Sequence, residues 1–69
     1  MKAQYKYAVG QTLTLGGMFR AKVIGLDIYH SEALNMDLPK YKVQTFLGST
    51  DILSPDVQSV HEHQLSVSR

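Results

Sequence analysis

The 69-residue chain contains no cysteine and no tryptophan. Without cysteine it cannot form disulfide bonds, thiolate zinc sites or iron–sulfur clusters, and it has no thiol nucleophile. Only two prolines and five glycines occur, so the composition is that of a folded globule and not of a disordered or collagen-like chain. At this length apolar burial barely outweighs the lost chain entropy. Self-association that buries more apolar surface is therefore a natural supplement.

The chain also lacks an excess of charge and a long apolar run. Seven Lys and Arg face six Asp and Glu, a net charge of +1, which exerts no strong attraction on nucleic acid or on an anionic membrane. No apolar run approaches the about 20 residues of a membrane helix, and no apolar segment follows the first residues as in a secretory signal. We expect one cytoplasmic domain over residues 1–69 with no membrane association.

Side chains that alternate with a period of two predict β-strands in the N-terminal half. The first expected strand covers residues 4–15, with a bulge or bend at Gly10. The dipeptide Gly16–Gly17 follows and suits a hairpin turn that requires positive φ. The second expected strand covers residues 18–28. Gly25 within it indicates a sharp bend, the device by which a small sheet curls into a barrel.

The next segment combines an expected loop with a third strand. Residues 29–40 have mixed polarity and include Pro39, whose ring and missing N–H resist a strand interior. We therefore expect the longest loop there, with at most one helical turn capped by Ser31. Residues 41–47 alternate cleanly and predict the third strand.

Residues 57–67 decide between an all-β and an α+β fold. Ser54, Pro55 and Asp56 would open a helix well, as a cap, a proline at the first helical position and an early acid. The alternative is a strand, a one-turn helical corner at residues 62–64 and a short closing strand. We favour the second interpretation, which makes the chain all-β.

This order of elements resembles an SH3-like barrel of five strands with a short helical corner before the last strand. The runs that carry a closer similarity are Gly10–Leu13, Phe19–Gly25, Tyr41–Val43, and Val57–Gln58 followed by Leu65. They are similar to the plasmid-borne type II dihydrofolate reductases, which implies a small barrel that assembles as a tetramer around a central pore. The family's motif continues Val-Gln-Ile-Tyr where this chain reads VQSV, and its pore lysine would fall near Thr14 or Leu15. Of the family's functional residues only Gln58 carries over.

We predict a non-enzymatic protein-interaction module, or a small accessory or regulatory protein of bacterial or phage origin. Its expected partner is another protein or a second copy of the chain. Aromatic rings beside the long loop suit such a contact, because a flat ring offers a large area at low entropic cost. Tyr29 is the expected surface contact and Tyr41 the expected wall of the core. The residues assigned to the partner surface are Tyr5, Tyr7, Tyr29, His30, Met36, Tyr41 and Gln58.

Two other functions are weighed against this one. The first is nucleic-acid binding by basic side chains that alternating strands would place on one outer face, namely Lys6, Arg20, Lys22 and Lys42. The second is an oligomeric reductase related to the type II enzymes. Strand alternation by itself also places basic side chains on the solvent-exposed face, where they need no partner. The small net charge favours this interpretation, in which the basic residues are simply solvated.

The sequence contains one group of residues with a metal-binding pattern. On a strand, His61 and His63 would share a face and could chelate zinc, nickel or copper if His30 or Asp27 approached. The helical corner predicted here would separate them. No nucleophile elbow, phosphate loop or dinucleotide fingerprint is present. We therefore predict no metal, no cofactor and no catalytic residue.

Overall fold

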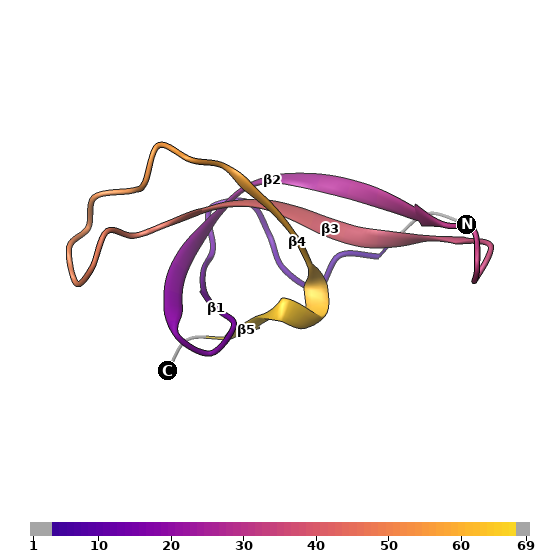
Figure 1. Ribbon diagram of the computed structural model, residues 1–69, viewed down its shortest axis with the longest axis horizontal. Coiled ribbons are helices and arrows are strands. Elements are labelled where there is room, and N and C mark those ends of the chain that lie inside the picture. The colour runs from indigo at the N-terminus through magenta and orange to yellow at the C-terminus, as the bar shows by residue number, and fades with distance from the viewer. Residues whose placement is uncertain (1–3, 68–69) are drawn as a thin grey trace.

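The computed structural model describes residues 4–67, which form one five-stranded antiparallel sheet (Figure 1). The strands are β1 (Thr12–Leu15), β2 (Phe19–Ser31), β3 (Met36–Thr45), β4 (Gln58–His61) and β5 (Leu65–Val67), and the 3-10 turn η1 (Glu62–Gln64) joins the last two. The predicted all-β fold with a helical corner before the last strand is confirmed at this level. Within residues 4–67, no helix is long and apolar enough to pass through a bilayer.

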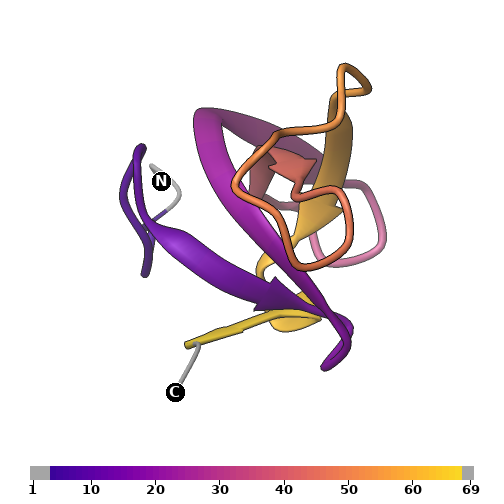
Figure 2. The same ribbon diagram turned by 90° about the vertical axis from the view of Figure 1, so that its left-hand side faces the viewer.

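The spatial order of the strands is β4-β3-β2-β1-β5, which makes β4 and β5 the two edges of the sheet. Figure 2 shows how the sheet curls, with β5 beside β1 and the η1 corner bringing the chain back from β4. Among the described strands no ladder joins β4 to β5, so the strand pairs define an open, curled sheet.

The turn between β1 and β2 is the one that the sequence predicts. Gly16 and Gly17 have φ values of 63° and 75°, in the left-handed region that glycine adopts without a steric penalty. They return the chain so that Leu15 lies opposite Phe19. The N–H of Gly16 also donates to the carbonyl of Gln64 at 2.9 Å, which ties the turn to η1.

The predicted bend at Gly25 is also present. The register between β2 and β3 shifts between Val23 and Gly25, and Ile24 is the extra residue of a β-bulge. A bulge bends its strand and increases the local twist. The shift therefore curls the sheet at the point where β2 passes from the core into its distal half.

Residues 4–11 are not a strand, contrary to the sequence prediction. Tyr5 and Tyr7 instead pack against Tyr41, with ring centroids 5.6 and 5.7 Å from the Tyr41 ring. Side chains of other elements accept the backbone N–H groups: Glu62 accepts that of Lys6 at 2.9 Å, and the Tyr41 hydroxyl accepts that of Tyr7 at 3.1 Å. The alternating pattern of this segment therefore reflects the Tyr5 and Tyr7 rings, which pack on the core. Hydrogen bonds to the Glu62 and Tyr41 side chains replace strand pairing at Lys6 and Tyr7.

The loop expected at residues 29–40 is not present. β2 and β3 pair through this stretch, and only residues 32–35 form a turn. Pro39 lies past the last β3–β4 pair, Lys40 with His61, where β3 has no second neighbour among the described strands. Proline is tolerated at such an edge position. We call residues 26–39 the β2–β3 arm.

The hydrophobic core lies on the concave side of the curled sheet and receives side chains from all five strands. The N-terminal segment covers it with Tyr7. Packing of side chains from distant segments is what holds a small chain without disulfides. The buried apolar residues are Tyr7, Leu13, Leu15, Ala21, Val23, Tyr41, Val43, Val60 and Leu65.

Candidate interaction surface

The β2–β3 arm projects from the sheet as a two-stranded ribbon (Figure 1). The molecule measures 40 × 24 × 18 Å, and the arm lies at one end of its long axis (Figure 1). A two-stranded ribbon buries little apolar surface by itself, because it has neither a third strand nor a second layer. The arm therefore presents its side chains to solvent.

Large apolar side chains are exposed on both faces of the arm. The strand register places Leu26 opposite Tyr41 and Ile28 opposite Pro39, on the face that holds the core further along the sheet. Tyr29 points to the other face. The exposed fractions are 45% for Leu26, 54% for Ile28, 46% for Tyr29, 62% for Leu34 and 43% for Met36. Contiguous exposed apolar side chains are typical of binding surfaces, since soluble monomers rarely leave large apolar patches open.

The structure brings three of the predicted surface residues together on this arm: Tyr29, His30 and Met36. Sequence reasoning missed Leu26 and Ile28 as exposed side chains. Their alternation was recognised as part of a strand that was expected to end at Ile28, and no surface role was assigned to either residue.

An aromatic row crosses the outer face of the sheet next to the arm. The Tyr29 and His61 rings are nearly perpendicular, with centroids 5.3 Å apart, and His61 stacks on His63 at 5.6 Å with an angle of 11° between the rings. The Nζ of Lys40 lies 5.8 Å from the centroid of Tyr29. These contacts fix the orientation of Tyr29 although nearly half of its surface is exposed.

His61 and His63 do not have the geometry of a chelating pair. The lone pairs of an imidazole lie in the ring plane, so two nearly parallel stacked rings direct them side by side and not to one point. Within residues 4–67 no group of three or more His, Asp or Glu side chains is arranged to hold a metal ion. His30 is engaged elsewhere: its Nδ1 lies 2.9 Å from Oδ1 of Asp37, across the arm.

Three of the predicted partner-binding tyrosines belong to the body of the protein. Tyr7 and Tyr41 are buried, and Tyr5 packs partly buried against them. The Tyr41 hydroxyl donates to Oε2 of Glu62 at 2.5 Å. Burial raises the pKa of Tyr41 above its usual range, and the hydrogen bond to Glu62 adds to the increase. These rings are unavailable to a partner while the fold is intact, and we leave them out of the proposed surface.

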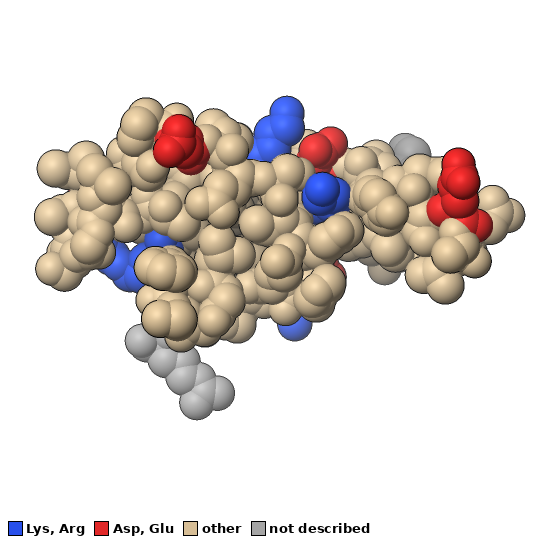
Figure 3. Space-filling view, in the orientation of Figure 1, with Lys and Arg blue, Asp and Glu red and all other residues tan. Residues whose placement is uncertain are grey.

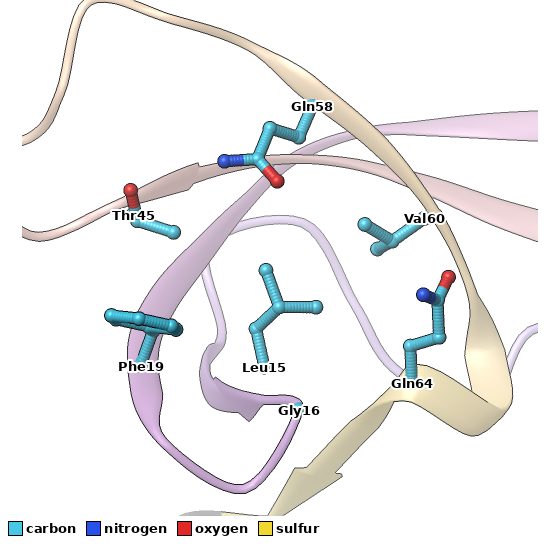
Figure 4. Close-up of a pocket in the computed structure, with 7 residues that line it drawn as sticks. All are labelled: Leu15, Gly16, Phe19, Thr45, Gln58, Val60 and Gln64. Atoms are coloured by element: carbon cyan, nitrogen blue, oxygen red, sulfur yellow. The ribbon is translucent and has the colours of Figure 1, made fainter.

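Gln58, the last predicted partner residue, lies away from the arm beside a hollow of about 370 Å³ (Figure 4). This hollow lies between β4 and the β1–β2 hairpin, where the curled sheet remains open. Its walls are apolar side chains from three strands, Leu15, Phe19 and Val60, and its polar lining comes from Thr45, Gln58 and Gln64. None of these six side chains carries a charge.

The four predicted basic residues do not form a single platform. Strand alternation puts Arg20, Lys22 and Lys42 on the outer face of β2 and β3. Arg20 is engaged there: its Nη2 donates to the carbonyl of Thr50 at 2.9 Å and lies 3.7 Å from Asp51. Lys6 lies elsewhere, in the N-terminal segment that contacts Glu62.

Comparison with known proteins gives no relative for this chain. No family model, no curated protein and no solved structure matches it.

Proposed function

We propose that the protein is a non-enzymatic interaction module that binds another protein through the β2–β3 arm. The observation that carries this proposal is the exposure of Leu26 and Ile28 on one face of the arm and of Tyr29 on the other. Each of these half-exposed side chains offers a partner on the order of 1 kcal/mol of further apolar burial. Because the ribbon is apolar on both faces, a partner protein can contact both of them.

The chemistry of the arm favours a protein partner over nucleic acid. Nucleic-acid platforms combine stacking rings with a basic groove that follows the phosphates. Here Lys6 lies apart from the other three basic residues, and Arg20 is engaged by Asp51. On the face drawn in Figure 3, Lys and Arg lie interspersed with Asp and Glu, without a continuous basic band. Binding through Lys6, Arg20, Lys22 and Lys42 remains the weaker candidate.

We also propose that the protein has an SH3-like barrel fold in which β4 and β5 do not pair to close the barrel. Five antiparallel strands, the bulge at Gly25 and the helical corner support this assignment. The reductase alternative rests on Gln58 alone and has no second supporting observation.

The test of arm binding compares serine variants inside and outside the arm. Ile28→Ser and Tyr29→Ser each remove one exposed apolar side chain from the arm. Met18→Ser is the control, because Met18 is 80% exposed and lies in the β1–β2 turn. Partner capture is quantified from extract of the native cells, and self-association is followed by sedimentation across a concentration series.

We expect wild type and Met18→Ser to behave alike and the arm variants to lose about tenfold or more in apparent affinity. Circular dichroism is the check that all the variants fold. Arm variants that retain full binding would contradict the proposal, as would a strict monomer that captures nothing.

A further inference from the structure

We infer that the free edge of β4 and the hollow beside it form a second binding site, which takes an extended peptide segment with one uncharged apolar side chain. The site is distinct from the arm. It lies at the seam of the curled sheet, between β4 and the β1–β2 hairpin (Figure 4). Two independent features support it: the hydrogen-bonding groups of the strand edge and the shape and chemistry of the hollow.

The edge of β4 offers backbone groups to a further strand. The N–H of His61 donates to Oε1 of Gln64 at 2.8 Å, so it points away from β3. In an antiparallel strand the backbone groups alternate between the two sides. Ser59, two residues earlier, therefore directs its N–H and C=O to the same free side. In the described part of the chain, β3 is the one strand that pairs with β4.

The hollow lies where a side chain of such an added strand would go. The residues of a strand that flank the position opposite Ser59 lie opposite Gln58 and Val60, and their side chains share the face of those two residues. Gln58 and Val60 both line the hollow. One peptide could therefore pair with Ser59 and insert a neighbouring side chain between Val60 and Phe19, which is the mode of strand addition with side-chain pockets.

The charge of the lining selects the kind of side chain. Leu15, Phe19 and Val60 give the hollow apolar walls, and none of the side chains that line it is charged. A charged side chain would lose its hydration there without gaining a partner. Gln58 and Gln64 add uncharged amides to the lining, and Oε1 of Gln64 already accepts the N–H of His61. The volume of about 370 Å³ falls within the usual range of ligand pockets, about 300–1,000 Å³.

The size of the contact favours a short peptide over a second copy. A ladder on the four residues of β4 is only about 13 Å long. Its footprint is a few hundred Å², far below the about 1,200 Å² that stable protein complexes bury. Pairing of two β4 edges would thus be too small to hold a dimer. A transient contact with an extended segment of another protein needs no more than this area.

The test uses two pairs of variants in the full-length protein. Ser59→Pro removes the N–H that the added strand needs, and Ser59→Ala is its control because it keeps this donor. The fold does not use the donor, and proline is tolerated on edge strands. Phe19→Ala removes a wall of the hollow, and Met18→Ala is its control. Phe19 is 57% exposed, so its truncation should leave the fold intact even if Ser59→Pro does not fold.

The probe is a library of random heptapeptides, selected on the immobilised protein and then measured as labelled synthetic peptides by fluorescence anisotropy. We expect enriched sequences that share one aliphatic or aromatic residue flanked by uncharged residues. Ser59→Pro and Phe19→Ala should each weaken their binding about tenfold or more. Ser59→Ala, Met18→Ala and the arm variant Ile28→Ser should bind as wild type does.

Several results would overturn the inference. A selection that enriches nothing, or peptides that bind Ser59→Pro and Phe19→Ala as well as wild type, would do so. Binding that Ile28→Ser removes would assign the peptides to the arm, and the arm proposal would stand without this one. A dimer seen in sedimentation and abolished by Ser59→Pro would show that the occupant of the edge is a second copy.

Discussion

The hydroxyl of Tyr41 donates a 2.5 Å hydrogen bond to Oε2 of Glu62 and so joins the middle of β3 to the η1 corner. The same carboxylate oxygen accepts the N–H of Lys6 at 2.9 Å, and the Tyr41 hydroxyl accepts the N–H of Tyr7 at 3.1 Å. These two side chains therefore anchor the N-terminal segment, which has no strand ladder, and they hold the corner that leads from β4 to β5.

Tyr41→Phe should destabilise the protein by about 1–3 kcal/mol, because the buried N–H of Tyr7 loses its acceptor and Glu62 loses a donor. Tyr29→Phe is the control, since the Tyr29 ring is 46% exposed. Its unfolding midpoint should stay close to that of wild type. Urea unfolding followed by circular dichroism measures both variants. Equal midpoints for the two would mean that the Tyr41 hydroxyl contributes nothing net.

The stability of the protein should fall at alkaline pH in a way that depends on Tyr41. Burial, with the hydrogen bond to Glu62, raises the pKa of Tyr41 above that of the unfolded chain, which is about 10. The stabilisation is therefore complete below about pH 10 and is lost as the pH rises through the higher folded-state pKa. Unfolding free energies measured between pH 8 and 11 should fall more steeply for wild type than for Tyr41→Phe. Parallel curves would contradict this assignment.

Alanine should be destabilising at one glycine and nearly neutral at another. Gly16 has a φ of 63°, and a side chain there costs about 1–2 kcal/mol although no atom would clash. Gly25 does not adopt a left-handed φ, and an added Cβ would lie 3.7 Å from side-chain atoms of Lys42, an ordinary contact. Gly16→Ala should lower the thermal midpoint, whereas Gly25→Ala should leave it nearly unchanged. A larger loss at Gly25 would mean that the bulge itself needs glycine.

Arg20→Ala should loosen the segment after β3 with little effect on global stability. The Arg20 guanidinium donates to the carbonyl of Thr50 and lies 4.6 Å from the ring centroid of Phe46. Exposed ion pairs such as that with Asp51 contribute at most about 1 kcal/mol. Hydrogen exchange should therefore speed up at the Thr50 amide while exchange in the core strands stays unchanged. Lys22→Ala is the control. Unchanged exchange at Thr50 would show that the segment after β3 keeps its conformation without Arg20.

The candidate surface could be predicted only in part. Tyr29, His30 and Met36 were assigned to it from the sequence, and all three lie on the arm. Tyr7 was assigned to the same surface but is buried. An aromatic residue in a strand-like pattern suits a core and a binding surface equally well, and only the position of its neighbours distinguishes the two. The hollow beside Gln58 could not be foreseen, because residues from β1 to η1 create it together.

The sequence by itself determined the features that depend on neighbouring residues. Period-two alternation placed most of β2 and the half of β3 from Tyr41 to Thr45, and Gly16–Gly17 specified the first turn because only glycine adopts two successive positive φ values at low cost. Tertiary structure decided where alternation was ambiguous. The N-terminal segment places Tyr7 over the core because side chains of distant elements accept the N–H groups of Lys6 and Tyr7. Pro39 remains in a strand because β4 ends before reaching it, and that is a matter of which strands meet in space.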